Sequence, residues 1–330
     1  MGAFSNEVPR YTLEEDSLPT NLGRYSQSLE DKSGTLSFAE VLSIKTSDDN
    51  QDLYWEPAPA HGITKGFTSS VYWVKFTIEN STLDPVNWNL EIGYPLLDYV
   101  EFYSPSHGAK SKGELTRRDQ FDIEYVGDRR PFDDRIISYR NIVFPLTLPP
   151  QSIETHYMRV KTVSSMNLPL IAWPGHSFYN EVDSVKMYLG MLYGIVVVAL
   201  LISLINSIFL KDTMYIWLSA SFVLLLLFMA GIKGTTFQYL WPNALWWQEV
   251  NIPFFINLSY GLAIQYCRLF TSLKDISPRL DRCIMLVAAF NCTLSLICLV
   301  ADYQVMIRFS SINAILMGFT CLGIGIYAWS

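Results

Sequence analysis

Long uncharged apolar stretches in the second half of the chain constrain the fold more than any other feature. Of the 24 basic and 31 acidic residues, 7 and 5 lie from residue 187 onward. Five stretches there approach the roughly 20 apolar residues that a helix needs to cross a bilayer. They cover about 187–210, 214–232, 250–270, 283–301 and 307–329. We therefore predict a helical transmembrane domain over residues 181–330.

Basic residues near these stretches predict their orientation. The densest basic cluster follows the third stretch and comprises Arg268, Lys274, Arg279 and Arg282. Connections on the cytoplasmic side of a membrane carry an excess of Lys and Arg. We therefore expect this connection in the cytoplasm, which puts the N-terminal half of the chain outside and the C-terminal end inside.

Residues 1–186 have the composition of a water-soluble domain. They hold the remaining 17 basic and 26 acidic residues, a net charge of −9, which argues against binding of nucleic acid or of an anionic lipid surface. All five cysteines lie in or beside the apolar stretches, so a disulfide framework is excluded in the first half. A domain of this length buries a core without disulfides.

Apolar residues alternate with polar ones between residues 71 and 160. In the segment "VYWVKFTIEN" the alternation puts four large side chains on one face: Tyr72, Val74, Phe76 and Ile78. The segment "VNWNLEI" repeats the pattern, and turn-forming residues separate such segments. We predict a β-sandwich or jelly roll over residues 35–180, with residues 1–34 part of it or leading into it.

The segment "GDRRPFDDRIISYRN" gathers six charged side chains in a predicted loop: Asp128, Arg129, Arg130, Asp133, Asp134 and Arg135. In one interpretation this loop is solvated, and its exposed ion pairs contribute little stability. In the other it binds a ligand, because arginines beside carboxylates grip sugar hydroxyls, carboxylates or a cation. Calcium needs several oxygen ligands, of which Asp128, Asp133 and Asp134 would supply some, although the spacing differs from that of an EF-hand.

The segment "GYPLLDYVEFY" contains two acids and three tyrosines, which raises the question of a ligand groove. Strand side chains alternate between faces, so Asp98 and Glu101 point in opposite directions and do not form one acid pair. We expect Glu101 to meet solvent together with Tyr99 and Tyr103. The loop Asp128–Arg135 therefore remains the first candidate for a ligand site.

Tryptophans are candidates for stacking on a sugar ring. Trp88 alternates in phase with Leu90 and Ile92, which favours packing in the core. Trp73 lies opposite the apolar face of its strand. It is therefore either an exposed ligand-binding ring or part of a second buried layer.

The predicted external connection "GTTFQYLWPNALWWQEV" is rich in aromatic side chains: Tyr239, Trp241, Trp246 and Trp247. Such residues are typical of the headgroup level of a bilayer, and a docking surface for the outer domain is the alternative. Polar residues inside the predicted spans, such as Asn257, Asn291 and Asn313, are uncharged and are expected to pair across helices. An ion or proton pathway would call for intramembrane charges, so a transporter is disfavoured.

Seven segments carry a resemblance to one protein family. Five lie in the first half: "VYWVKFTIENST", "WNLEIGYPLLDYVEFY", "GDRRPFDDR", "NIVFPLTLP" and "HYMRVKT". Two lie in the second half: "YLGMLYGIVVVALLISLINSIFLKDTMYIWLSASF" and "GTTFQYLWP". In order and spacing they resemble the bacterial seven-transmembrane receptors with diverse intracellular signalling modules. The resemblance extends from about residue 35 to the end.

The resemblance implies a signalling receptor of the bacterial inner membrane. Its periplasmic jelly-roll domain would bind a carbohydrate-like ligand or a metal ion such as Ca²⁺. The membrane domain would signal to a cytoplasmic module in the same chain, either a diguanylate cyclase that makes cyclic-di-GMP or a histidine kinase. Seven spans and an effector are expected of the family, whereas we recognise five spans and no effector, so we interpret the chain as truncated.

The chain itself shows no signature of catalysis. We find no nucleotide-binding loop, no context for a phosphoacceptor histidine and no nucleophile–base pair. No cofactor is expected apart from the calcium considered above, and a homodimer is left open. The alternatives to a receptor are a membrane-anchored module for adhesion or envelope assembly and, as the weaker one, a transporter.

Overall fold

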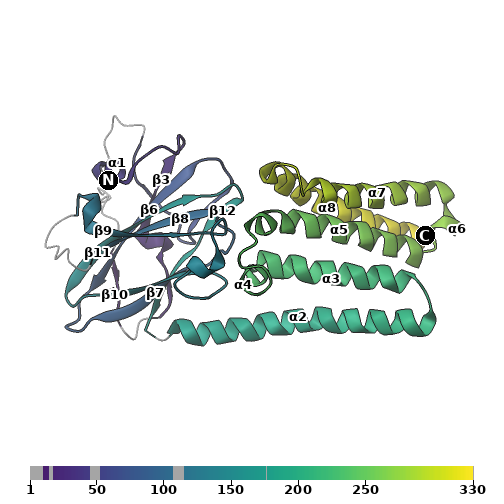
Figure 1. The fold of residues 1–330 in the computed structure, drawn as a ribbon, viewed down its shortest axis with the longest axis horizontal. Coiled ribbons are helices and arrows are strands. Elements are labelled where there is room, and N and C mark those ends of the chain that lie inside the picture. Colours follow the sequence, from purple (N-terminus) through teal and green to yellow (C-terminus); the bar gives the residue numbers. More distant parts are fainter. Residues whose placement is uncertain (1–9, 15–17, 45–52, 107–114, 176, 330) are drawn as a thin grey trace, which may run out of the picture. The chain divides into compact units, whose positions relative to one another are not determined.

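The computed structural model describes residues 10–14, 18–44, 53–106, 115–175 and 177–329. They divide into two compact units, of which the first ends at Val182 and the second begins at Asp183. The first unit is built from β-strands and the second from helices (Figure 1). The predicted fold class, a β-sandwich followed by a transmembrane helical bundle, is confirmed.

Sheet A is the larger sheet of the first unit. Its strands run in the order β4–β3–β6–β11–β8–β9, with β1 beside β6. They are β1 (Tyr11–Thr12), β3 (Ser26–Asp31), β4 (Glu56–Pro57), β6 (Val71–Asn80), β8 (Tyr99–Pro105), β9 (Phe121–Val126) and β11 (Ser152–Lys161). Neighbouring strands are antiparallel, except that β1 is parallel to β6.

Sheet B packs against one face of sheet A and closes the sandwich. Its order is β10 (Ile142–Leu148), β7 (Val86–Ile92), β13 (Leu170–Pro174) and β2 (Thr20–Asn21). Strands β5 (Ile63–Phe67) and β12 (Ser165–Leu168) pair separately. Side chains between the sheets form the main core, which includes Phe76, Trp88 and Phe144. Trp88 is 2% exposed, so its predicted place in the core is confirmed.

The opposite face of sheet A carries a second hydrophobic cluster. Trp73 is fully buried there beside Tyr103, and Phe38 of the helix α1 (Phe38–Ser43) stacks on Tyr103 with 4.0 Å between ring centroids. A capping box between Ser37 and Glu40 fixes the start of α1. The prediction that Trp73 is an exposed ligand-binding ring is therefore wrong, because α1 covers it as part of a second layer.

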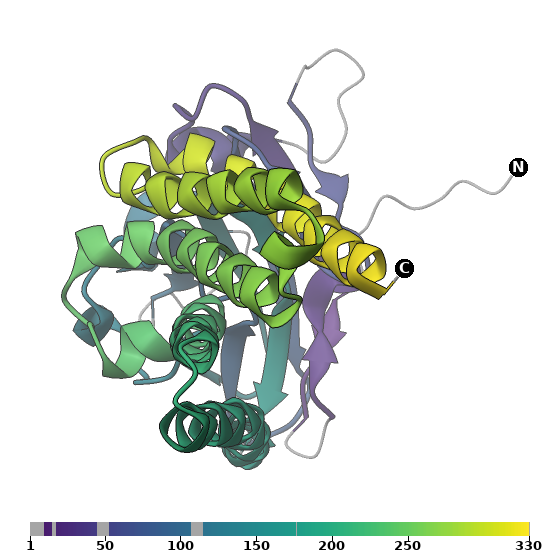
Figure 2. The same ribbon diagram turned by 90° about the vertical axis from the view of Figure 1, so that its right-hand side faces the viewer.

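The described residues of the first unit also form three short 3₁₀ helices: η1 (Leu22–Tyr25), η2 (Arg118–Gln120) and η3 (Phe132–Asp134). The long helices lie side by side in the second unit (Figures 1 and 2). The helices after α1 are α2 (Ser177–Leu210), α3 (Met214–Ile232), α4 (Thr235–Tyr239), α5 (Leu245–Phe270), α6 (Leu273–Ile276), α7 (Pro278–Ile297) and α8 (Tyr303–Trp329).

Four of the described helices have the length and hydropathy of membrane spans, whereas α5, with 26 residues, has the length but a lower hydropathy. The span predicted at α5 from apolar length therefore stays a prediction. Helix α5 covers the predicted third span, but polar residues such as Asn251 and Asn257 lower its hydropathy. Both side chains are fully buried, because α5 packs against α3, α7 and α8. A helix shielded by its neighbours tolerates polar groups that lipid would not.

Three buried asparagines join α5, α7 and α8. The amide nitrogen of Asn313 lies 2.9 Å from Oδ1 of Asn257 and 2.8 Å from Oδ1 of Asn291. Asn257 also donates to the Ser310 hydroxyl at 2.7 Å. The predicted pairing of intramembrane asparagines is confirmed. Leaving any one of them without its partners would be unfavourable in a medium without water, so the network holds the three helices in one arrangement.

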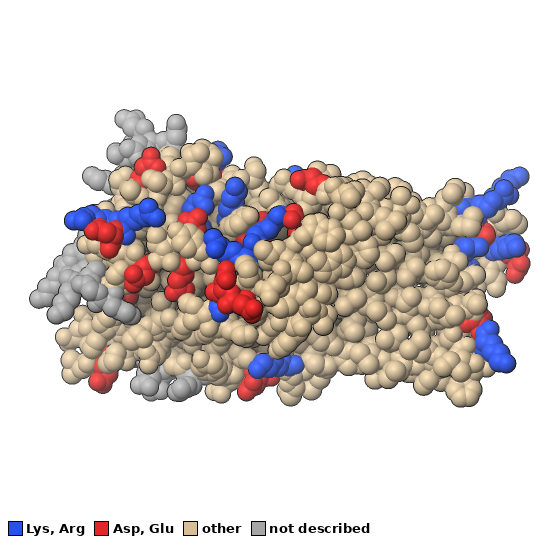
Figure 3. Space-filling view, viewed as in Figure 1, with Lys and Arg blue, Asp and Glu red and all other residues tan. Residues whose placement is uncertain are grey.

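Basic side chains gather at the end of the second unit where α6 lies (Figure 3). Lys274 lies in α6, and Arg279 and Arg282 lie in the first turns of α7. Arg268, in the last turn of α5, forms an ion pair with Asp281. The connection between α2 and α3, which contains Lys211, lies at the same end. The basic cluster that predicts the orientation is therefore confined to one end of this unit.

Replacing Gly261 by alanine should weaken the packing of α5 against α7. A Cβ at Gly261 would lie 2.7 Å from Sγ of Cys292 and 3.1 Å from the carbonyl oxygen of Ala288. Overpacking of this kind costs roughly 1–3 kcal/mol. We expect a lower melting temperature of the detergent-solubilised chain. Gly318→Ala in α8 is the matched control, because a Cβ there meets nothing within 4 Å. Equal melting temperatures for the two variants would contradict this packing.

Candidate functional site

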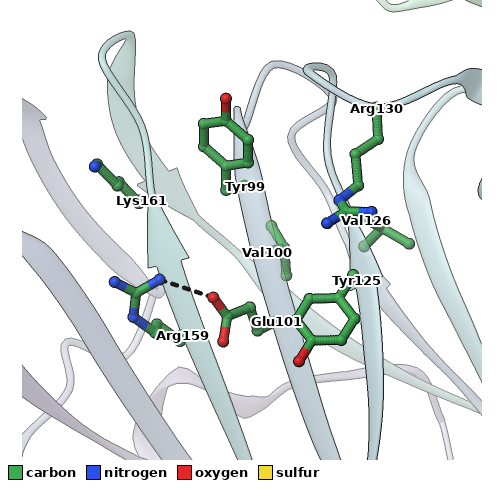
Figure 4. A pocket seen from close by; sticks show the side chains of 8 residues that line it. All are labelled: Tyr99, Val100, Glu101, Tyr125, Val126, Arg130, Arg159 and Lys161. Atoms are coloured by element: carbon green, nitrogen blue, oxygen red, sulfur yellow. Dashed lines mark hydrogen bonds and ion pairs between the residues drawn. The ribbon is translucent and has the colours of Figure 1, made fainter. Parts of the chain in front are cut away.

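A pocket of about 300 Å³ lies on the face of sheet A that bears the second cluster (Figure 4). Its walls come from β8, β9, the end of β11 and the loop after β9. The lining residues are Tyr99, Val100, Glu101, Tyr125, Val126, Arg130, Arg159 and Lys161. The pocket is open on one side, and its volume is at the lower end of those that hold small ligands.

Strand register brings the polar side chains of the pocket together. Glu101 of β8 lies opposite Tyr125 of β9 and opposite Arg159 of β11. Residues directly opposite in antiparallel strands point to the same face of the sheet. Three neighbouring strands therefore each contribute a polar or aromatic side chain to one small area.

An ion pair forms the floor of the pocket. Nη1 of Arg159 lies 2.8 Å from Oε1 of Glu101, and the Tyr103 hydroxyl donates to Oε2 of Glu101 at 2.7 Å. Arg159 also donates to the carbonyl oxygen of Gly34. Burial, and then the hydrogen bond to Glu101, raise the pKa of Tyr103 well above its usual value. Each oxygen of the Glu101 carboxylate therefore accepts one hydrogen bond from the protein and keeps capacity for another.

Two aromatic rings and two further cations also line the pocket. Tyr99 is 43% exposed and Tyr125 is 42% exposed. The Arg130 guanidinium carbon lies 5.3 Å from the centroid of the Tyr125 ring, which is within cation–π distance. Lys161 is exposed at the end of β11. Within the described part of the chain, neither Arg130 nor Lys161 has a carboxylate within ion-pair distance.

The structure separates the six charged residues of the predicted ligand loop. Arg130 alone among them lines the pocket. Asp133 and Asp134 are exposed on η3, whereas Asp128 and Arg135 are buried. Nε of Arg129 lies 3.3 Å from Oδ1 of Asp98. The loop is thus neither a uniform ligand surface nor a solvated set of ion pairs.

The calcium interpretation gains no support from the arrangement of the acids. Asp128 is buried, whereas Asp133 and Asp134 are exposed. Among the residues that the structure describes, no group of three or more His, Cys, Asp or Glu side chains is placed to hold a metal ion. The predicted set Asp128, Asp133 and Asp134 is therefore not brought together.

Asp98 and Gly127 anchor the start of the loop below the pocket. Gly127 has a φ of 149°, and a Cβ there would lie 2.0 Å from the carbonyl oxygen of Asp98. Only glycine permits this approach of the two backbones. The Asp98 carboxylate accepts hydrogen bonds from the Val163 backbone at 2.5 Å and from Arg129. Asp98 therefore ties the loop after β9 to the loop after β11.

Asp128 and Arg135 form the buried centre of the same loop. Burial, and then the neighbouring Asp98, raise the pKa of Asp128 to about 8. Nη1 of Arg135 donates to the carbonyl oxygens of Tyr139 at 3.0 Å and of Arg140 at 2.8 Å. Charged hydrogen bonds to backbone carbonyls fix the course of the chain from the pocket to β10.

The far end of this loop contacts the first turns of α2. The Tyr139 ring meets Phe178 of α2 edge-on, with 5.4 Å between centroids, and Trp173 also packs against Phe178. The Glu91 carboxylate accepts hydrogen bonds from Nε1 of Trp173 at 2.7 Å and from Nδ2 of Asn141 at 2.5 Å. All of these residues belong to the first unit. Residues 127–141 thus run from the pocket to the start of α2.

The four aromatic residues from α4 to the first turn of α5 fall into two pairs. Tyr239 and Trp246 are exposed, at 65% and 58%. Trp241 and Trp247 are half-buried and contact each other at 6.1 Å between centroids. Their predicted place at the headgroup level of a bilayer remains a prediction.

Comparisons with known families match both halves of the chain. The profile described as "7TMR-DISM extracellular 2" matches residues 23–174. The profile described as "7TM diverse intracellular signalling" matches residues 186–330. The chain belongs to the 7TMR-DISM family. This 7TMR-DISM protein is therefore a membrane signalling receptor with an extracellular N-terminal sensor domain, and the resemblance seen in the sequence is confirmed. Among curated proteins, no match to the chain is found.

Sequence reasoning missed the pocket, although it lies partly in the segment "GYPLLDYVEFY". Glu101 and Tyr99 do lie on the outward face, as expected, whereas Tyr103 is buried under Phe38. The contributions of β9 and β11 depend on strand order, which the sequence does not state. No signal in the sequence marks Tyr125, because in "FDIEYV" it follows the same alternation as the covered residues Phe121 and Ile123.

Replacing Asp128 by asparagine should change how the stability of the β domain depends on pH. The folded pKa of Asp128 is raised, so its contribution to the free energy of unfolding is largest below about pH 4 and is lost as pH rises through about 8. Asparagine does not titrate. We expect the variant to exceed the wild type in stability by on the order of 2 kcal/mol near pH 8, with the difference shrinking toward about pH 4.

The measurement is thermal or urea unfolding of the detergent-solubilised chain, followed by the infrared amide band of the β-sheets. Asp84→Asn is the matched control, because Asp84 is exposed. The pH dependence of Asp128→Asn is compared with that of this control. A difference between Asp128→Asn and the wild type that stays constant with pH would contradict the raised pKa of Asp128.

Proposed function

We propose that this 7TMR-DISM protein is a receptor of a Gram-negative inner membrane whose β domain senses a small, carbohydrate-like ligand in the periplasm. The ligand binds at the pocket between Tyr99 and Lys161. Binding biases the arrangement of the helices and so controls a cytoplasmic effector, a diguanylate cyclase or a histidine kinase. The chain itself carries the sensing and transmitting steps and no catalysis.

The observation that carries this proposal is the way α2 begins. Phe178 and Val182 are buried in a hydrophobic cluster of the β domain, together with Tyr139 and Trp173. The same helix continues to Leu210 and has the hydropathy of a membrane span. A helix whose first turns belong to the core of the sensor domain moves with that domain. A flexible linker in the same place would let the sensor domain move without moving the helix.

The loop 127–141 supports a route from the pocket to this helix. Arg130 lines the pocket, and Asp128 and Arg135 are buried between it and Tyr139, which contacts Phe178. A ligand that binds Arg130 better in one of two arrangements of the loop would raise the population of that arrangement. Because the loop is anchored by buried hydrogen bonds, such a shift would be passed to α2 as a displacement of packed side chains.

Charge distribution supports the orientation and the site of the effector. The basic cluster of Arg268, Lys274, Arg279 and Arg282 lies at the end of the helical unit where cytoplasmic connections are expected. The extracellular β domain precedes α2 in the chain. A signalling module attached at the C-terminal side would then lie in the cytoplasm.

A membrane-anchored adhesion or assembly module is the second candidate, because sheet A exposes aromatic rings on its outer face. Deletion of the β domain from the full-length receptor separates the two functions. A receptor would show an altered cyclic-di-nucleotide level or kinase output. Unchanged output with loss of surface attachment would instead establish the adhesion module.

Replacing Phe178 by alanine should uncouple the sensor domain from the helices. The change removes the ring that Tyr139 and Trp173 contact, while the pocket residues stay in place. We expect the effector to lose its response to ligand while the receptor still reaches the membrane. The readouts are the cyclic-di-GMP level or the kinase autophosphorylation of cells that carry the full-length receptor.

Asp183→Asn is the matched control for this experiment. Asp183 lies on the same helix, its side chain is 82% exposed, and its pairing with Lys186 is an exposed i,i+3 contact of little energetic weight. The control should respond as the wild type does. A full response of Phe178→Ala would refute transmission through the start of α2.

A further inference from the structure

The pocket on sheet A is electropositive in a domain that is otherwise acidic. Its lining contains three cationic side chains and one acidic one. The acid, Glu101, is paired with Arg159, so Arg130 and Lys161 remain as an excess of two positive charges. Residues 1–186 as a whole have a net charge of −9. The pocket therefore attracts anionic ligands, whereas the rest of the acidic surface repels them.

The two excess cations lie apart from each other. Figure 4 shows Lys161 and Arg130 on opposite sides of Tyr99, with Glu101 and Arg159 below it. They come from different segments, since Lys161 ends β11 and Arg130 follows β9. A ligand that meets both of them therefore carries two anionic groups separated by an uncharged portion.

The surface beside these cations suits a sugar ring. The rings of Tyr99 and Tyr125 are more than two-fifths exposed and offer apolar faces to the C–H face of a pyranose. The Glu101–Arg159 pair offers a carboxylate acceptor and guanidinium donors next to those rings. Sugar hydroxyls need both kinds of partner. An aliphatic dicarboxylate would use the cations and leave the rings without a partner.

We propose that the pocket binds an acidic oligosaccharide, in which two successive uronic acid units place one carboxylate at Arg130 and another at Lys161. The sugar rings lie against Tyr99 and Tyr125, and their hydroxyls meet Glu101 and Arg159. This inference rests on the proposed receptor function for its biological role, but the binding event is tested independently of any signal.

Isothermal titration calorimetry of the detergent-solubilised full chain tests this proposal. The probes are digalacturonate, its dimethyl ester, monomeric galacturonate and inorganic phosphate. We expect digalacturonate to bind at least about tenfold more tightly than the ester and than the monomer, because each carboxylate makes a charge-assisted contact. Its affinity should fall as salt is raised, since the cations are exposed.

Variants of the pocket distinguish the parts of the contact. Arg130→Gln and Lys161→Gln should each weaken digalacturonate about tenfold and leave the weak binding of the ester unchanged. Tyr125→Ala should weaken the acid and the ester alike, because it removes apolar contact and no charge. Arg117→Gln is the matched control, since Arg117 is an exposed arginine of the same domain outside this pocket.

Three outcomes would overturn the proposal. Equal affinity for the ester and the acid would remove the role of charge. Equal affinity for the monomer and the dimer would remove the second carboxylate, and phosphate that binds as tightly as digalacturonate would reduce the site to a general anion site. Absence of binding by every probe would overturn the ligand class itself.

Failure of this inference and failure of the receptor function give different results. If digalacturonate fails to bind but the effector still depends on Phe178, the receptor function stands with a different ligand. If digalacturonate binds but Phe178→Ala retains the full response, the ligand class stands and the proposed transmission fails.

Discussion

The two-residue period of side chains in sheet A is the constraint on which the rest of the first unit depends. Inward residues such as Phe76 and Phe102 build the core with sheet B. Outward residues build a second cluster under α1, and beyond its edge they form the pocket. One face of sheet A therefore packs in the core. The other face has a part that is buried under α1 and a part that is open at the pocket. The open part is where exposed aromatic rings and cations are retained.

The loop 127–141 connects this open part to the membrane-directed helix. Its start is fixed because Gly127 approaches the backbone of Asp98 too closely for any side chain. Its middle is held by the buried Arg135, and its end packs on Phe178. Buried charged groups contribute little net stability, but they make a loop costly to rearrange partially. In the proposed mechanism such a loop would change between discrete arrangements, which is the property that a sensor needs.

A different constraint shapes the helical unit, where lipid offers polar groups no partners. Helix α5 carries the buried polar side chains Asn251 and Asn257, and it is also the helix that packs against α3, α7 and α8. Its Asn257 meets Asn313, which also meets Asn291. The network joins three helices without any charge, in keeping with a unit that transmits a change of packing. An ion pathway would place charges where these amides lie.

The sequence by itself determined the division into a soluble β domain and apolar helices, the core place of Trp88, the pairing of intramembrane asparagines and the family. Each of these follows from local periodicity, composition or segment order. Periodicity also assigned Glu101 and Tyr99 to an outward face. Apolar length also predicts a span at α5, whereas the burial of its asparagines depends on the helices that surround it.

Only the tertiary structure decided which outward faces are covered. Trp73 and Tyr103 are outward residues of sheet A and are buried, whereas Tyr99 and Tyr125 are outward residues of the same sheet and are open. The difference is made by α1, which is distant in sequence from all four. The pocket likewise needs β9 and β11 on either side of β8, and strand order is set by long-range packing. Local pattern therefore predicts the face of a side chain, and the global fold decides what that face meets.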